Sequence, residues 1–134
     1  MDWKIEVVTI PVSDIDGARD FYTEKIGFEV DIDFKVSDDL RLVQLTPPGS
    51  ACSIHLGKGT VDMEPGSIDG VFLVVRDVRA ARAELVERGV EVGELQVFDE
   101  GAYRPAEEGE DVGSVFFSDP DGNRWCMQQI STST

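Results

Sequence analysis

Two stretches of the chain, VVTIPV at 7–12 and GVFLVV at 70–75, are dominated by branched apolar residues. Short apolar runs of this kind are typical of buried β-strands. An aspartate follows each run, Asp14 in the first case and Asp77 in the second, at the position of a helix N-cap. The pattern therefore predicts a strand followed by a helix, twice in one chain.

The two stretches belong to an internal repeat. Asp14 and Asp77 lie 63 positions apart, and the same offset aligns Ala18-Arg19 with Ala81-Arg82. Apolar residues recur at helical spacing within each copy. A glycine ends each predicted helix, where its freedom to adopt a left-handed conformation is useful. These glycines are Gly27 and Gly89.

Each copy continues into further strand-like segments. They are 28–35, 40–46 and 51–57 in the first copy, and 91–98, 112–118 and 123–130 in the second. This order predicts an α+β fold with two tandem βαβββ modules. The domain organisation we expect is one domain over 1–134, made of repeat 1 (about 3–57) and repeat 2 (about 69–130), with a polar linker between them.

One acidic segment, DEGAYRPAEEGED at 99–111, interrupts the second copy. Tyr103 and Arg104 are its only large side chains that are not acidic. Long irregular loops inside compact domains are often functional. We predict an irregular stretch here, and a lid over a pocket is one of its possible roles.

The composition excludes several classes of protein. The chain is 41% hydrophobic and 29% charged, as in ordinary globular domains, and no apolar run is long enough for a membrane span. Its 12 basic and 27 acidic residues give a net charge of −15, which disfavours nucleic-acid binding. The start of the sequence has no signal-peptide pattern, so we expect a cytoplasmic protein. Two cysteines do not form a disulfide framework, and we expect free thiols.

The segments VTIPVSDIDGARDFYTEKIGF, VQLTPPGSACSIHLG and DPDGNRWCMQQ resemble the vicinal oxygen chelate superfamily. This superfamily includes glyoxalase I, extradiol dioxygenases, fosfomycin-resistance enzymes and bleomycin-binding resistance proteins. The resemblance implies a cupped mixed sheet around a central cavity, with the helices on its outer face. It also implies a homodimer. A shared fold hosts unrelated reactions, so the resemblance leaves the chemistry open.

Enzymes of this superfamily hold a divalent metal on the inner face of the cup. The resemblance places the expected ligands at Val7, Gly70 and Cys126, with Ser53 or His55 as the matching position in the first half. Valine and glycine have no side-chain donor, and a zinc site needs three or four ligands. We therefore expect no metal and no cofactor.

Strand alternation then predicts the residues on the inner face. Those expected to contact a small organic ligand are Trp3, Ser53, His55, Phe72, Cys126 and Gln128, with Tyr103 and Arg104 from the acidic segment. The result is an apolar and aromatic pocket with a few hydrogen-bonding groups, which suits an organic molecule. We read the DPDGN turn as structural.

Three functions remain compatible with these residues. The first is a metal-independent binding protein of the glyoxalase/bleomycin-resistance type, which holds an aromatic or drug-like ligand and confers antibiotic resistance. The second is a lyase or isomerase with His55 as general base, or a glyoxalase-like enzyme with an atypical metal site. The third is a degenerate scaffold or regulatory partner that keeps the fold without the site. The sequence favours the first and names no ligand.

Overall fold

The computed structural model describes residues 1–37, 40–58 and 60–129. It divides the chain into two units. Unit 1 contains Met1–Ile68 together with Asp119–Asn123, and unit 2 contains Asp69–Ser118 together with the chain from Arg124 onward. The DPDGN turn therefore belongs to unit 1, although the strands on either side of it belong to unit 2.

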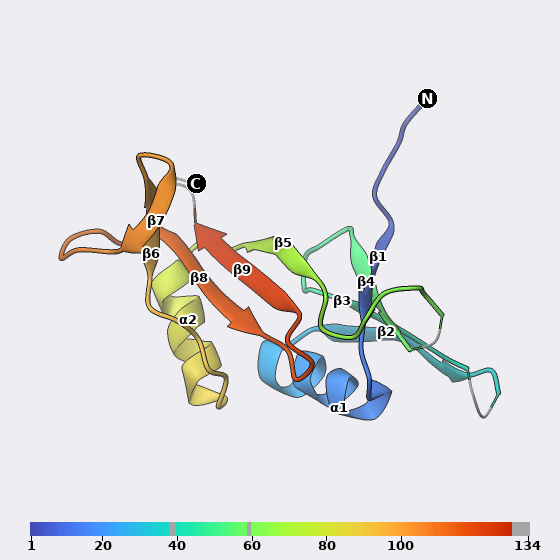
Figure 1. Ribbon diagram of the computed structural model, residues 1–134. Coiled ribbons are helices and arrows are strands. Elements are labelled where there is room, and N and C mark those ends of the chain that lie inside the picture. Colours follow the sequence, from blue (N-terminus) through green and yellow to red (C-terminus); the bar gives the residue numbers. More distant parts are fainter. Residues whose placement is uncertain (38–39, 59, 130–134) are drawn as a thin grey trace. The chain divides into compact units, whose positions relative to one another are not determined.

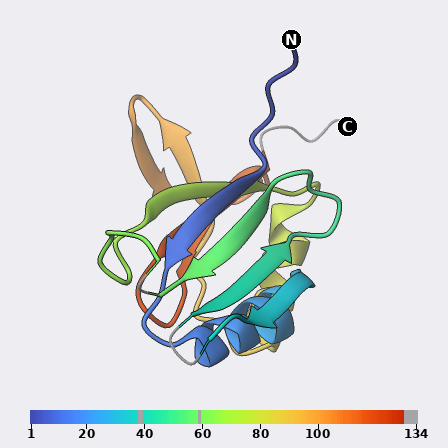
Figure 2. The ribbon, with the colours of Figure 1, turned by 90° about the vertical axis from the view of Figure 1, so that its right-hand side faces the viewer.

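Unit 1 is a four-stranded sheet with one helical segment against it (Figure 2). The strand order is β1-β4-β3-β2, and β1 runs parallel to β4. The elements are β1 (Val7–Pro11), α1 (Ile15–Asp20), a π-helical continuation η1 (Phe21–Ile26), β2 (Glu29–Lys35), β3 (Arg41–Thr46) and β4 (Ser53–Gly57).

Unit 2 repeats this topology. Its sheet has the order β5-β9-β8-β6-β7, with β5 parallel to β9, and α2 contacts β8 and β9 (Figure 1). The elements are β5 (Asp69–Val74), α2 (Val78–Glu87), β6 (Gln96–Asp99), β7 (Ala102–Pro105), β8 (Gly113–Ser118) and β9 (Arg124–Gln129). The predicted α+β fold and its internal repeat are confirmed, and β7 is an addition to the second copy.

Strand alternation separates a core face from an open face in each sheet. In unit 1 the side chains of Ile10, Val43 and Leu45 are fully buried on the face that α1 covers. In unit 2 the core face carries Trp125 and Phe117, whose rings stack with centroids 6.2 Å apart. We call the opposite face of each sheet its open face. Ser53 and His55 lie on it in unit 1, and Ser114, Cys126 and Gln128 lie on it in unit 2.

The predicted helix boundaries are largely confirmed. The Asp77 side chain caps α2 by accepting a hydrogen bond from Ala80 N at 3.0 Å. Asp14 is the N-cap residue of α1, as predicted, and has the extended N-cap backbone, but its side chain makes no capping hydrogen bond. Gly27 and Gly89 have φ values of 93° and 87°, the left-handed conformation expected at these helix ends.

The segment predicted as irregular contains a strand instead. The strand predicted over 91–98 is also too early, because β6 begins only at Gln96. Glu100 and Gly101 have φ values of 51° and 84°, and they form the two-residue connection between β6 and β7. Two left-handed residues favour a tight hairpin, which explains why an acidic segment continues the sheet. Residue 130, at the end of the last predicted strand, lies outside the described residues.

The DPDGN turn is fixed by buried hydrogen bonds within unit 1. Asp119 accepts a bond from the Tyr22 hydroxyl at 2.7 Å, and Asn123 Nδ2 donates to Pro11 O at 2.8 Å. Asn123 Oδ1 accepts from Ile68 N at 3.1 Å. Since buried polar groups are stable only when they are paired, these contacts give the turn a structural role, as the sequence predicts.

Candidate functional site

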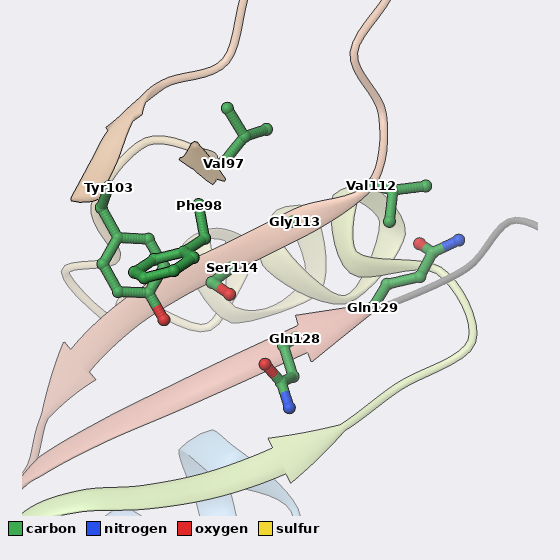
Figure 3. A pocket seen from close by; sticks show the side chains of 8 residues that line it. All are labelled: Val97, Phe98, Tyr103, Val112, Gly113, Ser114, Gln128 and Gln129. Atoms are coloured by element: carbon green, nitrogen blue, oxygen red, sulfur yellow. The ribbon is translucent and has the colours of Figure 1, made fainter. Parts of the chain in front are cut away.

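A cavity of about 420 Å³ lies on the unit 2 sheet where β6 and β7 extend beside β8 and β9. Figure 3 shows the rings of Phe98 and Tyr103 together at one side, with the Ser114 hydroxyl and the Gln128 amide below them. The lining residues are Val97, Phe98, Tyr103, Val112, Gly113, Ser114, Gln128 and Gln129. Aromatic walls with a few polar groups are typical of small-molecule pockets.

An aromatic row continues from the pocket across the sheet. The ring centroids of Phe98 and Tyr103 are 5.1 Å apart, and those of Tyr103 and Phe116 are 5.2 Å apart, both in edge-to-face geometry. The Arg124 guanidinium carbon lies 4.1 Å above the Phe116 ring. Phe98 remains 67% exposed and Tyr103 42% exposed, so the row can still bury apolar area against a ligand.

Four of the residues predicted from the sequence lie on the open face of unit 2. Tyr103 and Gln128 line the pocket, and Cys126 lies beside Phe116 in the strand register. Phe72 pairs with Cys126 on β5 and is 50% exposed. Alternation along the strands therefore places these four side chains on one face, as predicted. The repeat alignment would make Gly70 the neighbour of Cys126 on β5, but the neighbour in the structure is Phe72, two residues later.

Cys126 has the properties of a structural thiol. It is only 2% exposed, and burial raises its pKa, an effect that a hydrogen bond with Ser114 partly offsets. Thiolates are the reactive form of cysteine, so both the burial and the raised pKa oppose a nucleophilic role. Cys52 is also a free thiol, and it is more accessible.

Iodoacetamide is expected to alkylate Cys52 several times faster than Cys126 in the folded protein, because Cys126 is shielded and its thiolate is disfavoured. Peptide mass spectrometry after timed quenching measures the two rates. Unfolding in urea should make the rates similar, which provides the control. Faster labelling of Cys126 in the folded protein would contradict the structural assignment.

Arg104 has its guanidinium in an ion-pair cluster rather than in the pocket lining. It follows Tyr103 on β7, so its side chain leaves the strand on the other face. Its guanidinium binds Glu110 at 2.7 Å and Asp99 at 3.1 Å. These bonds tie the β6–β7 hairpin to the acidic segment that follows it, and the contact with Arg104 lowers the pKa of Glu110 to about 2.

The Glu110 carboxylate is expected to titrate near pH 2 in the folded protein, and Arg104→Ala should return it toward its ordinary value of 4.5. Because the pKa of Glu110 is lower in the folded protein than in the unfolded chain, the ionised carboxylate stabilises the folded hairpin at pH values above about 4.5. This contribution is lost as the pH falls from about 4.5 to about 2. Carboxyl ¹³C chemical shifts measure both midpoints. Equal midpoints in the two proteins would rule out the ion pair as the cause.

Ser53 and His55 lie on the open face of unit 1. They are on β4, two residues apart, beside Val7 and Thr9 of β1. The His55 Nε2 and Gln44 Oε1 atoms are 2.9 Å apart, and the Ser53 and Thr46 hydroxyl oxygens are 2.6 Å apart. The predicted face is therefore correct for both residues, and the sequence did not identify their partners on β3.

Trp3 does not lie on the sheet. It precedes β1, which begins at Val7, and its side chain is 85% exposed in a segment that extends away from the strand (Figures 1 and 2). The prediction that Trp3 lies on the inner face of the sheet is therefore wrong. Contact of Trp3 with a ligand stays a prediction.

The residues at the expected metal positions do not fit a metal centre. Val7 and Gly70 have no side-chain donor, and the residue that pairs with Cys126 on β5 is Phe72. Within residues 1–37, 40–58 and 60–129, no group of three His, Cys, Asp or Glu side chains is arranged to hold an ion. We therefore derive no chemical step through a metal.

None of the helices in the described part of the chain is long and apolar enough to cross a membrane.

No curated protein sequence matches the chain. Three solved structures illustrate what it is similar to.

One is the antibiotic binding protein TnmS3 from Streptomyces sp. CB03234, which is 34% identical over 97% of this chain and 98% of that chain, with a TM-score of 0.78. A glyoxalase/bleomycin resistance protein from the same organism is 34% identical over 94% and 100% of the two chains, with a TM-score of 0.74. A superfamily member from Sphaerobacter thermophilus DSM 20745 is 30% identical over 96% and 98%, with a TM-score of 0.77.

The family model of the Glyoxalase/Bleomycin resistance protein/Dioxygenase superfamily matches residues 4–127, which is nearly the whole chain. The match agrees with the two βαβ-containing modules and with their parallel β1–β4 and β5–β9 pairs. The chain belongs to the Glyoxalase/Bleomycin resistance protein/Dioxygenase superfamily.

Proposed function

We propose that this chain binds an aromatic, drug-like small molecule without a metal, and that the unit 2 pocket holds it. The observation that carries the proposal is the partly exposed aromatic row formed by Phe98, Tyr103 and Phe116. Ring faces and edges that remain accessible gain both apolar burial and favourable aromatic geometry when a flat ligand enters.

Polar groups beside the row would orient the ligand. Ser114 and Gln128 face each other across β8 and β9, and both line the pocket. A hydroxyl and a carboxamide each donate and accept hydrogen bonds, so they suit a neutral carbonyl or hydroxyl substituent. Similarity to the antibiotic binding protein TnmS3 supports an antibiotic as the ligand class and a role in resistance.

A lyase or isomerase that uses His55 as base has weaker support. The imidazole contacts the neutral Gln44 amide at 2.9 Å. In efficient histidine bases, a carboxylate directly bonded to the ring stabilises the imidazolium that forms. We therefore favour binding over catalysis.

The function is tested by a thermal-shift screen of aromatic antibiotics and related planar compounds. A binder should raise the melting temperature in proportion to ligand concentration. Mass spectrometry of the recovered compound should show it unchanged after prolonged incubation. Conversion of a stabilising compound would replace the binding role by an enzymatic one, and a screen without any stabilising compound would oppose both.

The family resemblance also implies a homodimer, and the sequence implies a cytoplasmic location. Both remain proposals. Native mass spectrometry of the purified protein tests the first, and it also reports any bound metal. Fractionation of the producing cells tests the second.

A further inference from the structure

Five polar side chains form a connected network on the open face of unit 1. The Thr46 hydroxyl donates to Asp31 in a short contact, and the Thr46 and Ser53 hydroxyl oxygens are 2.6 Å apart. Gln44 Nε2 lies 3.5 Å from Asp31 Oδ2, and Gln44 Oε1 lies 2.9 Å from His55 Nε2. Two hydrogen-bonded branches therefore meet at the Asp31 carboxylate.

Asp31 lies at a β-bulge in β2. The pairing of β2 with β3 shifts between Val30 and Ile32, so Asp31 has no direct cross-strand partner. Val30 pairs with Leu45 on the core face, so alternation places Asp31 on the open face. The shift in pairing places Ile32, which pairs with Gln44, on the open face as well. The bulge therefore leaves two consecutive side chains, those of Asp31 and Ile32, on the open face.

The direction of every hydrogen bond in the network follows from the Asp31 carboxylate, which in its ionised form can only accept. Thr46 must therefore donate to Asp31, and its oxygen accepts from the Ser53 hydroxyl. Gln44 must turn its amide nitrogen toward Asp31, since the reverse orientation would place two oxygens together. Its oxygen then accepts from His55 Nε2–H.

Both branches consequently end in acceptors. Ser53 uses its proton toward Thr46, so the Oγ lone pairs remain, and the neutral His55 ring has its lone pair on Nδ1. Neither atom has another partner in the described part of the chain. The two residues are two positions apart on β4, so the acceptors are separated by roughly 6–7 Å along the strand.

The negative charge of Asp31 is not offset by the neighbouring arginines. Arg19 and Arg41 both bind Asp33, at 2.8 and 2.9 Å, on the opposite face of the sheet. Apolar side chains of the open face border the network instead: Phe34 is 60% exposed and Ile32 is 39% exposed. An anion would be repelled here, whereas a ring that carries donor groups would meet both acceptors and apolar surface.

We propose that this network is a second binding site, which recognises a small molecule with two hydrogen-bond donors on an alicyclic ring, as in aminocyclitols or amino sugars. Ser53 Oγ and His55 Nδ1 accept the two hydrogen bonds, and Asp31 polarises both branches. All five residues of the network belong to unit 1, whereas the aromatic pocket is lined by residues of unit 2.

Three ring compounds of the same shape test the proposal: trans-1,4-diaminocyclohexane, trans-1,4-cyclohexanediol and trans-1,4-cyclohexanedicarboxylate. They are titrated into the ¹⁵N-labelled full chain while amide, Gln44 side-chain and His55 ring signals are followed. The diamine and the diol should shift signals of β3 and β4, and the dicarboxylate should not. The uncharged diol shows that the effect is not simple attraction to an acidic protein.

Asp31→Asn should weaken diamine binding at least about tenfold, because hydrogen bonds strengthened by charge are lost. Glu24→Gln, an equal change of charge at an exposed helical position, should change it less than twofold. Ser53→Ala removes one acceptor with little loss of volume and should weaken the diol severalfold. Thermal melting verifies that each variant is folded.

The proposal is overturned if the dicarboxylate shifts the same signals as strongly, if the shifts lie outside β3 and β4, or if Asp31→Asn behaves like Glu24→Gln. Tyr103→Ala should leave diamine binding unchanged. Failure of this site can therefore be distinguished from failure of the aromatic pocket.

Discussion

Asn123→Ala is expected to lower the free energy of unfolding by about 3 kcal/mol, since each buried polar group left without its partner costs roughly 1–3 kcal/mol. The Asn123 side chain is fully buried. Its amide nitrogen donates to Pro11 O and to Asp119 Oδ2, both at 2.8 Å, and its oxygen accepts from Ile68 N at 3.1 Å. Alanine removes all three bonds and leaves a cavity.

Urea denaturation followed by circular dichroism measures this change. Tyr22→Phe removes only the hydroxyl bond to Asp119 and should cost less, about 1 kcal/mol. Glu24→Ala, at an exposed position, should stay within about 0.5 kcal/mol of the parent protein. An Asn123→Ala variant as stable as Glu24→Ala would show that the DPDGN turn does not hold unit 1 together.

Tyr103→Ala is expected to weaken binding of an aromatic ligand between about tenfold and a hundredfold. The ring lies between Phe98 and Phe116, with centroid distances of 5.1 and 5.2 Å, so its removal interrupts the aromatic row. Loss of a buried aromatic contact costs about 1.5–3 kcal/mol, and 1.4 kcal/mol corresponds to a factor of ten in affinity. Isothermal titration calorimetry with a compound from the thermal-shift screen measures the effect.

Tyr103→Phe is the matched control, because it keeps the ring and removes only the hydroxyl. It should retain affinity within a few fold. Val86→Ala, a half-exposed position on α2, should have no effect. If Tyr103→Ala and Val86→Ala bind equally well, the ligand does not use the aromatic row.

The repeat made much of the fold predictable from the sequence. Asp77 and the helix-ending glycines Gly27 and Gly89 are local signals that require no knowledge of tertiary contacts. Alternation also placed Ser53 and His55 on one face of their strand, because a period of two does not depend on the neighbouring strands. The family was likewise evident from motifs, and its model matches residues 4–127.

The remaining site residues depended on features without a clear sequence signal. A bulge at Asp31 shifts the pairing of β2 with β3 and interrupts the alternation from which faces are assigned in a sequence. Phe98 and Tyr103 come together because Glu100 adopts a left-handed conformation, which is uncommon outside glycine. The glycine of the Glu100-Gly101 pair indicates a tight turn at this point, but the pair lies in an acidic segment whose composition is typical of an irregular loop.

Intermolecular NOEs between a stabilising aromatic ligand and the protein, measured by NMR, test directly whether the unit 2 pocket holds the ligand. We expect NOEs from the ligand ring to Phe98, Tyr103 and Phe116, with the ligand chemically unchanged. NOEs confined to other residues, or a ligand that is converted during the measurement, would contradict a binding role for the unit 2 pocket.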